Sequence, residues 1–153
     1  MSQVEFVSNA DLLYGIIVRN SFVTEGIKFF TPDDFSQQLA YMHHEAGKNI
    51  EPHIHNLVPR EVHYTQEVLF IRRGRLRVDF YDEMYRHFKS FELCPGDVIL
   101  LCGGGHGFEV LEELEMIEVK QGPYAGEADK LRFHGFETQH KPFARNDKHE
   151  DSC

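Results

Sequence analysis

The stretch GKNIEPHIHNLVPREVHYTQEVLFIRRG, Gly47–Gly74, decides the fold predicted for this chain. His53 and His55 are two residues apart, a spacing that places both imidazoles on one face of a β-strand, so we expect a strand over residues 50–55. Glu67 begins an apolar run that predicts a second strand, ended by a turn at the final glycine of the stretch. Two histidines on one strand and a carboxylate on the next can meet around one metal ion.

A third histidine, His106, follows the apolar run Val98–Leu101 and three consecutive glycines, Gly103–Gly105. Glycine permits the sharp bend and close backbone approach that a chain needs where a strand enters a small cavity. Three imidazoles and one carboxylate suit Fe, Mn, Ni, Cu or Zn, and the ligand types alone do not choose among these metals. A six-coordinate ion would keep two positions open for catalysis, whereas a tetrahedral zinc would be closed. Both alternatives stay open.

These residues resemble the first motif of the cupin superfamily, G-x5-H-x-H-x3,4-E-x6-G. The matching positions are Gly47, His53, His55, Glu67 and Gly74. The sequence departs from the motif in one place, because 11 residues separate the second histidine from the glutamate. Those residues form an insertion relative to the family pattern, and the insertion lies beside the expected metal site.

A later segment resembles the second cupin motif, G-x5-P-x-G-x2-H-x3-N. The segment begins at Pro95–Asp97 and continues to Gly104 and His106. Cys102 stands where the family has proline, the histidine comes one residue early, and Val110 stands where asparagine would be expected.

The resemblance spans roughly residues 35–124 and implies an all-β fold, a cupin barrel of the double-stranded β-helix or jelly-roll type. It implies one cupin domain over residues 1–135, and this domain includes an N-terminal strand extension. Small cupins that resemble this chain often pair through sheet edges, so we expect a homodimer. The resemblance also implies one divalent transition metal (Fe, Mn, Ni or Zn), held by His53, His55, Glu67 and His106.

Short apolar segments separated by turn residues favour an all-β fold independently of the motifs. Leu76, Val78 and Phe80 alternate with charged residues, which is the period of a half-buried strand. Thr31–Asp34 resembles a helix start, whereas the cupin motif requires a strand from about Gln37. We follow the motif and expect a single turn at the proline. Further strands are expected over residues 12–18, 98–101 and 116–120.

The whole-chain composition limits the classes of partner. The 153 residues carry a formal net charge of -9, which argues against a nucleic-acid-binding protein because such proteins present a basic patch. The sequence contains no apolar run long enough to span a membrane and no evident signal peptide. The three cysteines are scattered, so a reduced, cytoplasmic compartment is the simplest expectation. Residues 136–153 are polar and charged and are expected to form a poorly ordered tail.

Five further residues are candidates for chemistry on a small polar substrate. His63 has the strand parity of Glu67, and Lys120 shares a face with Glu118, so these three are the candidate proton-transferring groups. Arg60 and Tyr64 lie in the insertion, where a guanidinium can bind a substrate carboxylate or phosphate through a forked contact.

The sequence supports functions from two classes. The first is a metal-dependent enzyme that acts on a small polar substrate, sugar-derived substrates included. Such an enzyme would isomerise or epimerise the substrate, or would use iron and dioxygen as a dioxygenase. The second is a non-catalytic module that binds or senses a small molecule. An enzyme needs an acid or base beside the open metal positions, whereas a carrier needs only complementary walls, so the surroundings of Glu118, Lys120 and His63 distinguish the two classes. A structural zinc in an inert scaffold is a third alternative.

Overall fold

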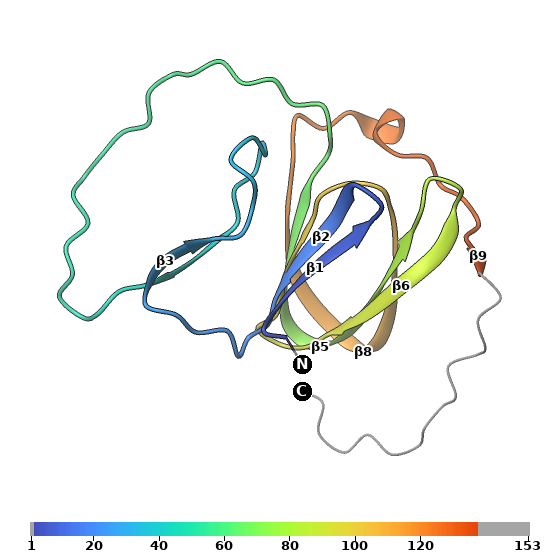
Figure 1. Cartoon of the computed structure of the whole chain (residues 1–153), viewed down its shortest axis with the longest axis horizontal. Helices are drawn as coiled ribbons and strands as arrows, with labels where there is room; N and C mark the ends of the chain where they lie inside the picture. The colour runs from blue at the N-terminus through green and yellow to red at the C-terminus, as the bar shows by residue number, and fades with distance from the viewer. Residues whose placement is uncertain (1, 138–153) are drawn as a thin grey trace.

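The computed structural model describes residues 2–137, and this part of the chain is all-β apart from one short 3-10 helix, as the sequence predicts. Seven strands form a large antiparallel sheet with one short parallel pair at β9, and β3 pairs with β4 separately (Figure 1). The elements are β1 (Val4–Asn9), β2 (Leu12–Val18), β3 (Gly26–Phe29), β4 (Ala40–His43), β5 (Glu67–Tyr81), β6 (Arg86–Leu93), β7 (Val98–Leu101), β8 (Gly105–Lys120), η1 (Gly126–Asp129) and β9 (Phe136–Glu137).

Part of the sequence prediction concerns residues that the structure does not describe. Of the expected tail over residues 136–153, the first two residues form β9, and the rest lies outside the described residues. No helix in the described part has the length and hydrophobicity that a membrane span requires.

The large sheet curls around β5, the strand that pairs with β6, β7 and β8. Leu101 at the end of β7 pairs with Glu67 at the start of β5, whereas His106 near the start of β8 pairs with Phe80 near the end of β5. Only residues 102–104 join β7 to β8. So short a connection can reach both ends of β5 only if the sheet bends back on itself, and the result is a half-barrel (Figure 1).

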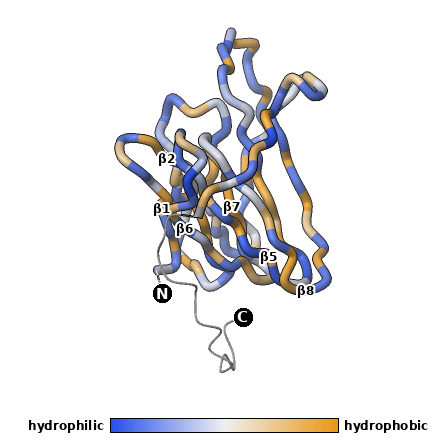
Figure 2. The backbone as a smooth tube through the Cα atoms, turned by 90° about the vertical axis from the view of Figure 1, so that its right-hand side faces the viewer, coloured by the Kyte–Doolittle hydropathy of each residue, from blue (hydrophilic) through white to orange (hydrophobic). Residues whose placement is uncertain are grey.

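The inner face of the half-barrel carries the main core. Leu69 and Ile71 lie on this face in the first half of β5, and Leu76, Val78 and Phe80 continue it in the second half. All five side chains are almost fully buried. Burying each such side chain stabilises the fold by about 1.5–3 kcal/mol. Figure 2 shows the hydrophobic stretches of β5 and β7 side by side, as their pairing requires.

The outer face is partly covered by the segment that contains β3 and β4. Ile16 and Leu100 point outward from the large sheet and form a second core with Phe30. The ring of Phe22 packs edge-on against Phe30 and Tyr41, with centroid distances of 5.3 and 5.2 Å. The strand expected from about residue 37 corresponds to β4, which begins at Ala40. It packs on the sheet through the aromatic contacts of Tyr41.

The turn predicted at Gly74 is wrong, because β5 continues through this position, and β8 likewise continues through Glu112 and Glu113. The pairing of the two strands shifts register there, which marks a shared bend. Gly74 has a φ of +80°, and a Cβ at this position would overlap the carbonyl oxygen of Glu113. The turn-forming residues thus mark a bend where two paired strands approach closely.

The strand predicted over residues 50–55 is also wrong. Residues 44–66 contain no helix or strand and trace a wide arc away from the sheet (Figure 1). Pro52 and Pro59 each lack the N–H that a sheet ladder uses, and Ile54 is 89% exposed, so no burial supports an extended strand. Alternating residues form a stable strand only when a neighbouring strand or core receives one face.

Candidate functional site

The polar centre of the inner face is Glu67, the first residue of β5, which is 9% exposed. Lys120 lies opposite it in the β5–β8 ladder and donates from Nζ to Glu67 Oε1 over 2.7 Å. His106 Nε2 lies 3.3 Å from the other oxygen, Oε2. Strand pairing fixes the first contact, and the short connection between β7 and β8 brings the imidazole to the second.

Two further residues extend this group beyond the sheet. Lys120 Nζ also lies 3.1 Å from Asp129 Oδ2 in η1, and Thr65 Oγ1 donates to Asp129 Oδ1 over 2.6 Å. We call these residues the mouth cluster: Thr65, Glu67, His106, Lys120 and Asp129. The sequence analysis missed two of them. Thr65 has the strand parity of Glu67 and could have been found on that ground, whereas no sequence signal marks Asp129.

The contacts fix the charges of the mouth cluster. The hydrogen bond from His106, followed by the one from Lys120, holds the pKa of Glu67 at about 2 even though burial opposes ionisation. The hydrogen bonds to Glu67 and Asp129 raise the pKa of Lys120. At neutral pH the pair is therefore a carboxylate and an ammonium ion. Lys120, predicted to move a proton, holds its proton tightly and can act through its charge and its hydrogen bonds.

The four predicted metal ligands fall into two separate pairs. Glu67 and His106 meet in the mouth cluster, and the rings of His53 and His55 pack edge-on with centroids 5.3 Å apart on the exposed arc. Across residues 2–137, no three His, Cys, Asp or Glu side chains are grouped so that they could hold a metal ion. In this arrangement the residues do not fit around one ion, and Lys120 occupies one oxygen of the carboxylate.

Three of the four remaining predicted site residues line a hollow of about 400 Å³ beside the mouth cluster: Arg60, His63 and Tyr64. The fourth, Glu118, does not. His63 Nε2 is 3.5 Å from Glu61 Oε1 and is largely exposed. Glu118 is exposed on β8 and forms no ion pair with any described residue, so it does not join the site. The hollow lies between the last residues of the arc and the loop that follows β8. Its lining includes Arg60, His63, Tyr64, Thr65, Gln121, Gly122 and Pro123.

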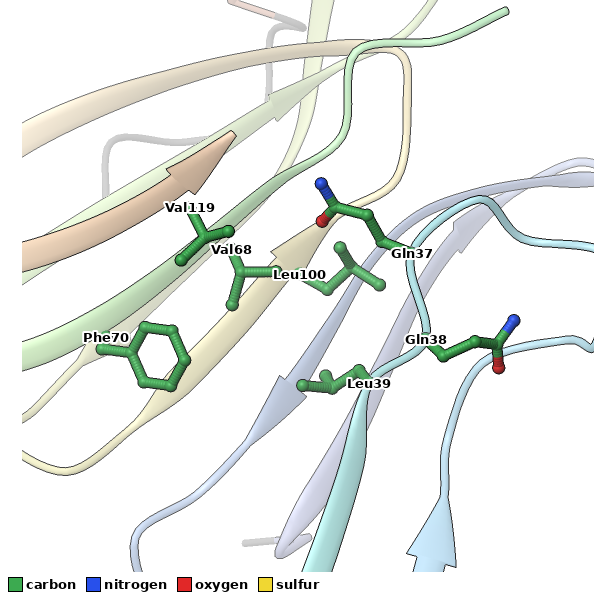
Figure 3. Close-up of a pocket in the computed structure, with 7 residues that line it drawn as sticks. All are labelled: Gln37, Gln38, Leu39, Val68, Phe70, Leu100 and Val119. Atoms are coloured by element: carbon green, nitrogen blue, oxygen red, sulfur yellow. The ribbon is translucent and has the colours of Figure 1, made fainter. Parts of the chain in front are cut away.

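A second hollow, of about 340 Å³, lies on the outer face (Figure 3). Val68, Phe70 and Val119 line it from the sheet, and Gln37–Leu39 line it from the opposite side. The Oε1 atom of Gln37 is buried there without a hydrogen-bond partner. No titratable side chain lines this groove, so it offers no acid–base chemistry.

Comparison with known proteins identifies no relative: no family model, no curated protein and no solved structure matches the chain. The structure itself establishes an all-β chain with a curled antiparallel sheet and a polar group on its inner face. The cupin resemblance rests on the two sequence motifs, of which the Glu67 and His106 parts come together and the His53 and His55 part stays apart.

Proposed function

We propose that this protein is a single-domain, cupin-like protein that binds a small polar molecule at the mouth cluster. One observation carries the proposal. Glu67 holds both His106 and Lys120 on the inner face, and the latter two side chains are 29% and 26% exposed, so a solute can reach them. A buried carboxylate that positions two reachable donors is a common way to orient a ligand.

The same geometry supports chemistry on the bound molecule. Lys120 carries a fixed positive charge, which stabilises negative charge that develops on a substrate oxygen. The His106 ring can give or take a proton at a neighbouring carbon or hydroxyl group. Together they favour isomerisation or epimerisation of a small polar substrate, sugar-derived substrates included, with proton transfer next to a carbonyl.

Metal-dependent catalysis is a second proposal, supported by the cupin motif residues His53, His55, Glu67 and His106. In this structure these residues form two separate pairs that do not surround one ion. Elemental analysis of untagged protein and of His55→Ala tests it: one Fe, Mn, Ni or Zn per chain, lost in the variant, supports the metal site. Full occupancy in the variant would overturn the ligand assignment. The homodimer and the cytoplasmic location remain predictions.

A non-catalytic binding or sensing protein is the alternative to an enzyme. Solvent-facing orientations of Glu118, Lys120 and His63 would favour binding alone. Glu118 and His63 are exposed, whereas Lys120 contacts Glu67 and Asp129. Lys120 keeps a charged group at the site and His106 supplies an acid or base beside it, so these two residues together favour an enzyme.

A thermal-shift screen tests the proposed function. Aldoses, ketoses, sugar acids and 2-oxo acids are added to the wild-type protein and to His106→Gln, with Glu118→Gln as the control for an exposed β8 residue. A ligand of the folded state raises the Tm by mass action. We expect at least one compound to raise the Tm of wild type and of the control, and to lose that effect in His106→Gln. If no compound acts, or if His106→Gln responds as wild type does, the proposal fails.

A further inference from the structure

The arginines of the described chain divide into two groups. Six of them form ion pairs with carboxylates: Arg19, Arg73, Arg75, Arg77, Arg86 and Arg132. Arg60 and Arg72 form none with any residue in the range 2–137. In a chain with a formal charge of -9, carboxylates are plentiful, so an arginine without one stands out.

Arg60 differs from Arg72 in its position. Both side chains are exposed, but Arg60 lines the hollow beside the mouth cluster, whereas Arg72 lies on β5 and does not line it. The single hydrogen bond of the Arg60 side chain runs from Nη1 to the carbonyl oxygen of Val58 over 3.5 Å, at the limit for such a bond. Its guanidinium therefore keeps most of its five donors available inside a concave surface.

Three other polar residues line the hollow together with Arg60: His63, Tyr64 and Gln121. The acidic group nearest to the histidine, Glu61, lies 3.5 Å from its Nε2 and is largely exposed. Arg60 brings a fixed positive charge to this wall, and a guanidinium suits a ligand with acceptor oxygens.

The chain fixes one wall of the hollow to the mouth cluster. The backbone N–H of Gln121 donates to the carbonyl oxygen of Gln66 over 2.9 Å. Thr65, which lines the hollow, donates to Asp129, and Asp129 in turn contacts Lys120. A molecule that occupies the hollow therefore lies next to the groups proposed to act on it.

We infer that the ligand carries a single terminal oxyanion, a carboxylate or a phosphate, which Arg60 and His63 bind in the hollow while the polar remainder reaches the mouth cluster. This inference rests on the proposed function and names its substrate class. The planar guanidinium binds such a group through two parallel hydrogen bonds. One arginine and one histidine match one oxyanion, and they exclude a multiply phosphorylated molecule as the best ligand.

Titration calorimetry at low salt tests the inference with inorganic phosphate, the monocarboxylate glycolate and neutral glucose as probes. Arg60→Gln removes the guanidinium, and Arg72→Gln is the matched control, because it removes the other unpaired arginine, which does not line the hollow. We expect phosphate or glycolate to bind wild type and Arg72→Gln equally. The same anion should bind Arg60→Gln about tenfold more weakly or worse, because a charged hydrogen bond is lost. Tighter binding of phosphate or of glycolate identifies which oxyanion the site prefers.

Three outcomes would overturn the inference. The first is equal binding of the anions to Arg60→Gln and wild type, and the second is equal loss in both arginine variants, which would indicate a general charge effect. The third is binding of glucose without binding of either anion. That third result leaves the proposed function standing, because a neutral polar molecule still binds, whereas a failed thermal-shift screen removes the proposed function itself.

Discussion

The curled sheet and the arc over residues 44–66 carry the two halves of one sequence motif in different physical surroundings. On the sheet, Glu67 is held by a ladder partner and by His106, and the surrounding side chains are buried. On the arc, His53 and His55 contact one another, and the chain around them is exposed. Strand pairing supplies a register that fixes side chains in space, and a segment without a partner strand lacks it.

The comparison explains which parts of a motif locate a site. A spacing of two residues places side chains on one face only if the backbone is extended and paired. Glu67 meets that condition because β7 and β8 flank it on both edges. His53 and His55 do not meet it, because their segment contains prolines, is exposed and pairs with no strand.

The largest expected difference between the two regions is in stability. Phe80 is fully buried and packs against the rings of Tyr14, Phe88 and Phe91. We expect Phe80→Ala to lower the free energy of unfolding by about 3–5 kcal/mol, and Ile54→Ala on the arc to change it by less than about 0.5 kcal/mol. Denaturant unfolding measures both, and similar values for the two variants would contradict the division.

A pair of glycines gives a second, smaller contrast. Gly74 and Gly47 both have positive φ, but a Cβ would overlap Glu113 at the first position and meets no atom within 4 Å at the second. Gly74→Ala is expected to cost more than about 2 kcal/mol, because the backbone must also shift. Gly47→Ala should cost only about 1 kcal/mol from its left-handed backbone. Equal melting temperatures of the two variants would show that the bend in β5 is not tightly packed.

Much of the fold follows from local signals in the sequence. Alternation at Leu76, Val78 and Phe80 predicts a strand with one buried face, and the structure confirms it. The irregular features do not follow in this way. The glycine at position 74 resembles a turn in the sequence, yet only the pairing of β5 with β8 makes it a bend.

The candidate site was predictable in part. Glu67 and Lys120 come from apolar segments that are recognisable as strands, and the resemblance to the second cupin motif points to His106. Asp129 could not be predicted, because its role depends on where a short helix places it beside Lys120, and no periodic pattern encodes that placement.

The contribution of Glu67 to stability should depend on pH in the acid range, whereas an exposed carboxylate on the arc should contribute little. The pKa of Glu67 falls from its ordinary 4.5 to about 2 in the folded protein. Its ionised form therefore stabilises the fold above pH 4.5, and that contribution is lost as the pH falls through about 2. Glu67→Gln removes at most about 3 kcal/mol at neutral pH.

The measurement is the free energy of unfolding as a function of pH, with Glu51→Gln on the exposed arc as the control. We expect the curve of Glu67→Gln to be flatter than that of wild type in the acid range, and the curve of the control to follow wild type. A Glu67→Gln curve as steep as wild type would mean that the carboxylate is not held in ionised form.

The smallest expected effect is that of His55→Ala on the affinity for a ligand. His55 lies apart from the mouth cluster, so we expect His55→Ala to leave the Kd of a compound from the thermal-shift screen unchanged. His106→Ala should raise the Kd of the same compound by about tenfold or more, since it removes a direct hydrogen bond. Calorimetry with both variants checks this, and a comparable loss in His55→Ala would place residues 53–55 at the site as well.

The most direct test of the account is nuclear magnetic resonance mapping of a polar compound from the screen on ¹⁵N-labelled protein. The account predicts that the largest chemical-shift changes fall on the amides of Glu67, His106 and Lys120, with smaller changes at residues 60–65. Changes confined to the outer groove around Gln37 and Phe70, or to residues 53–55, would contradict the assignment of the mouth cluster as the binding site.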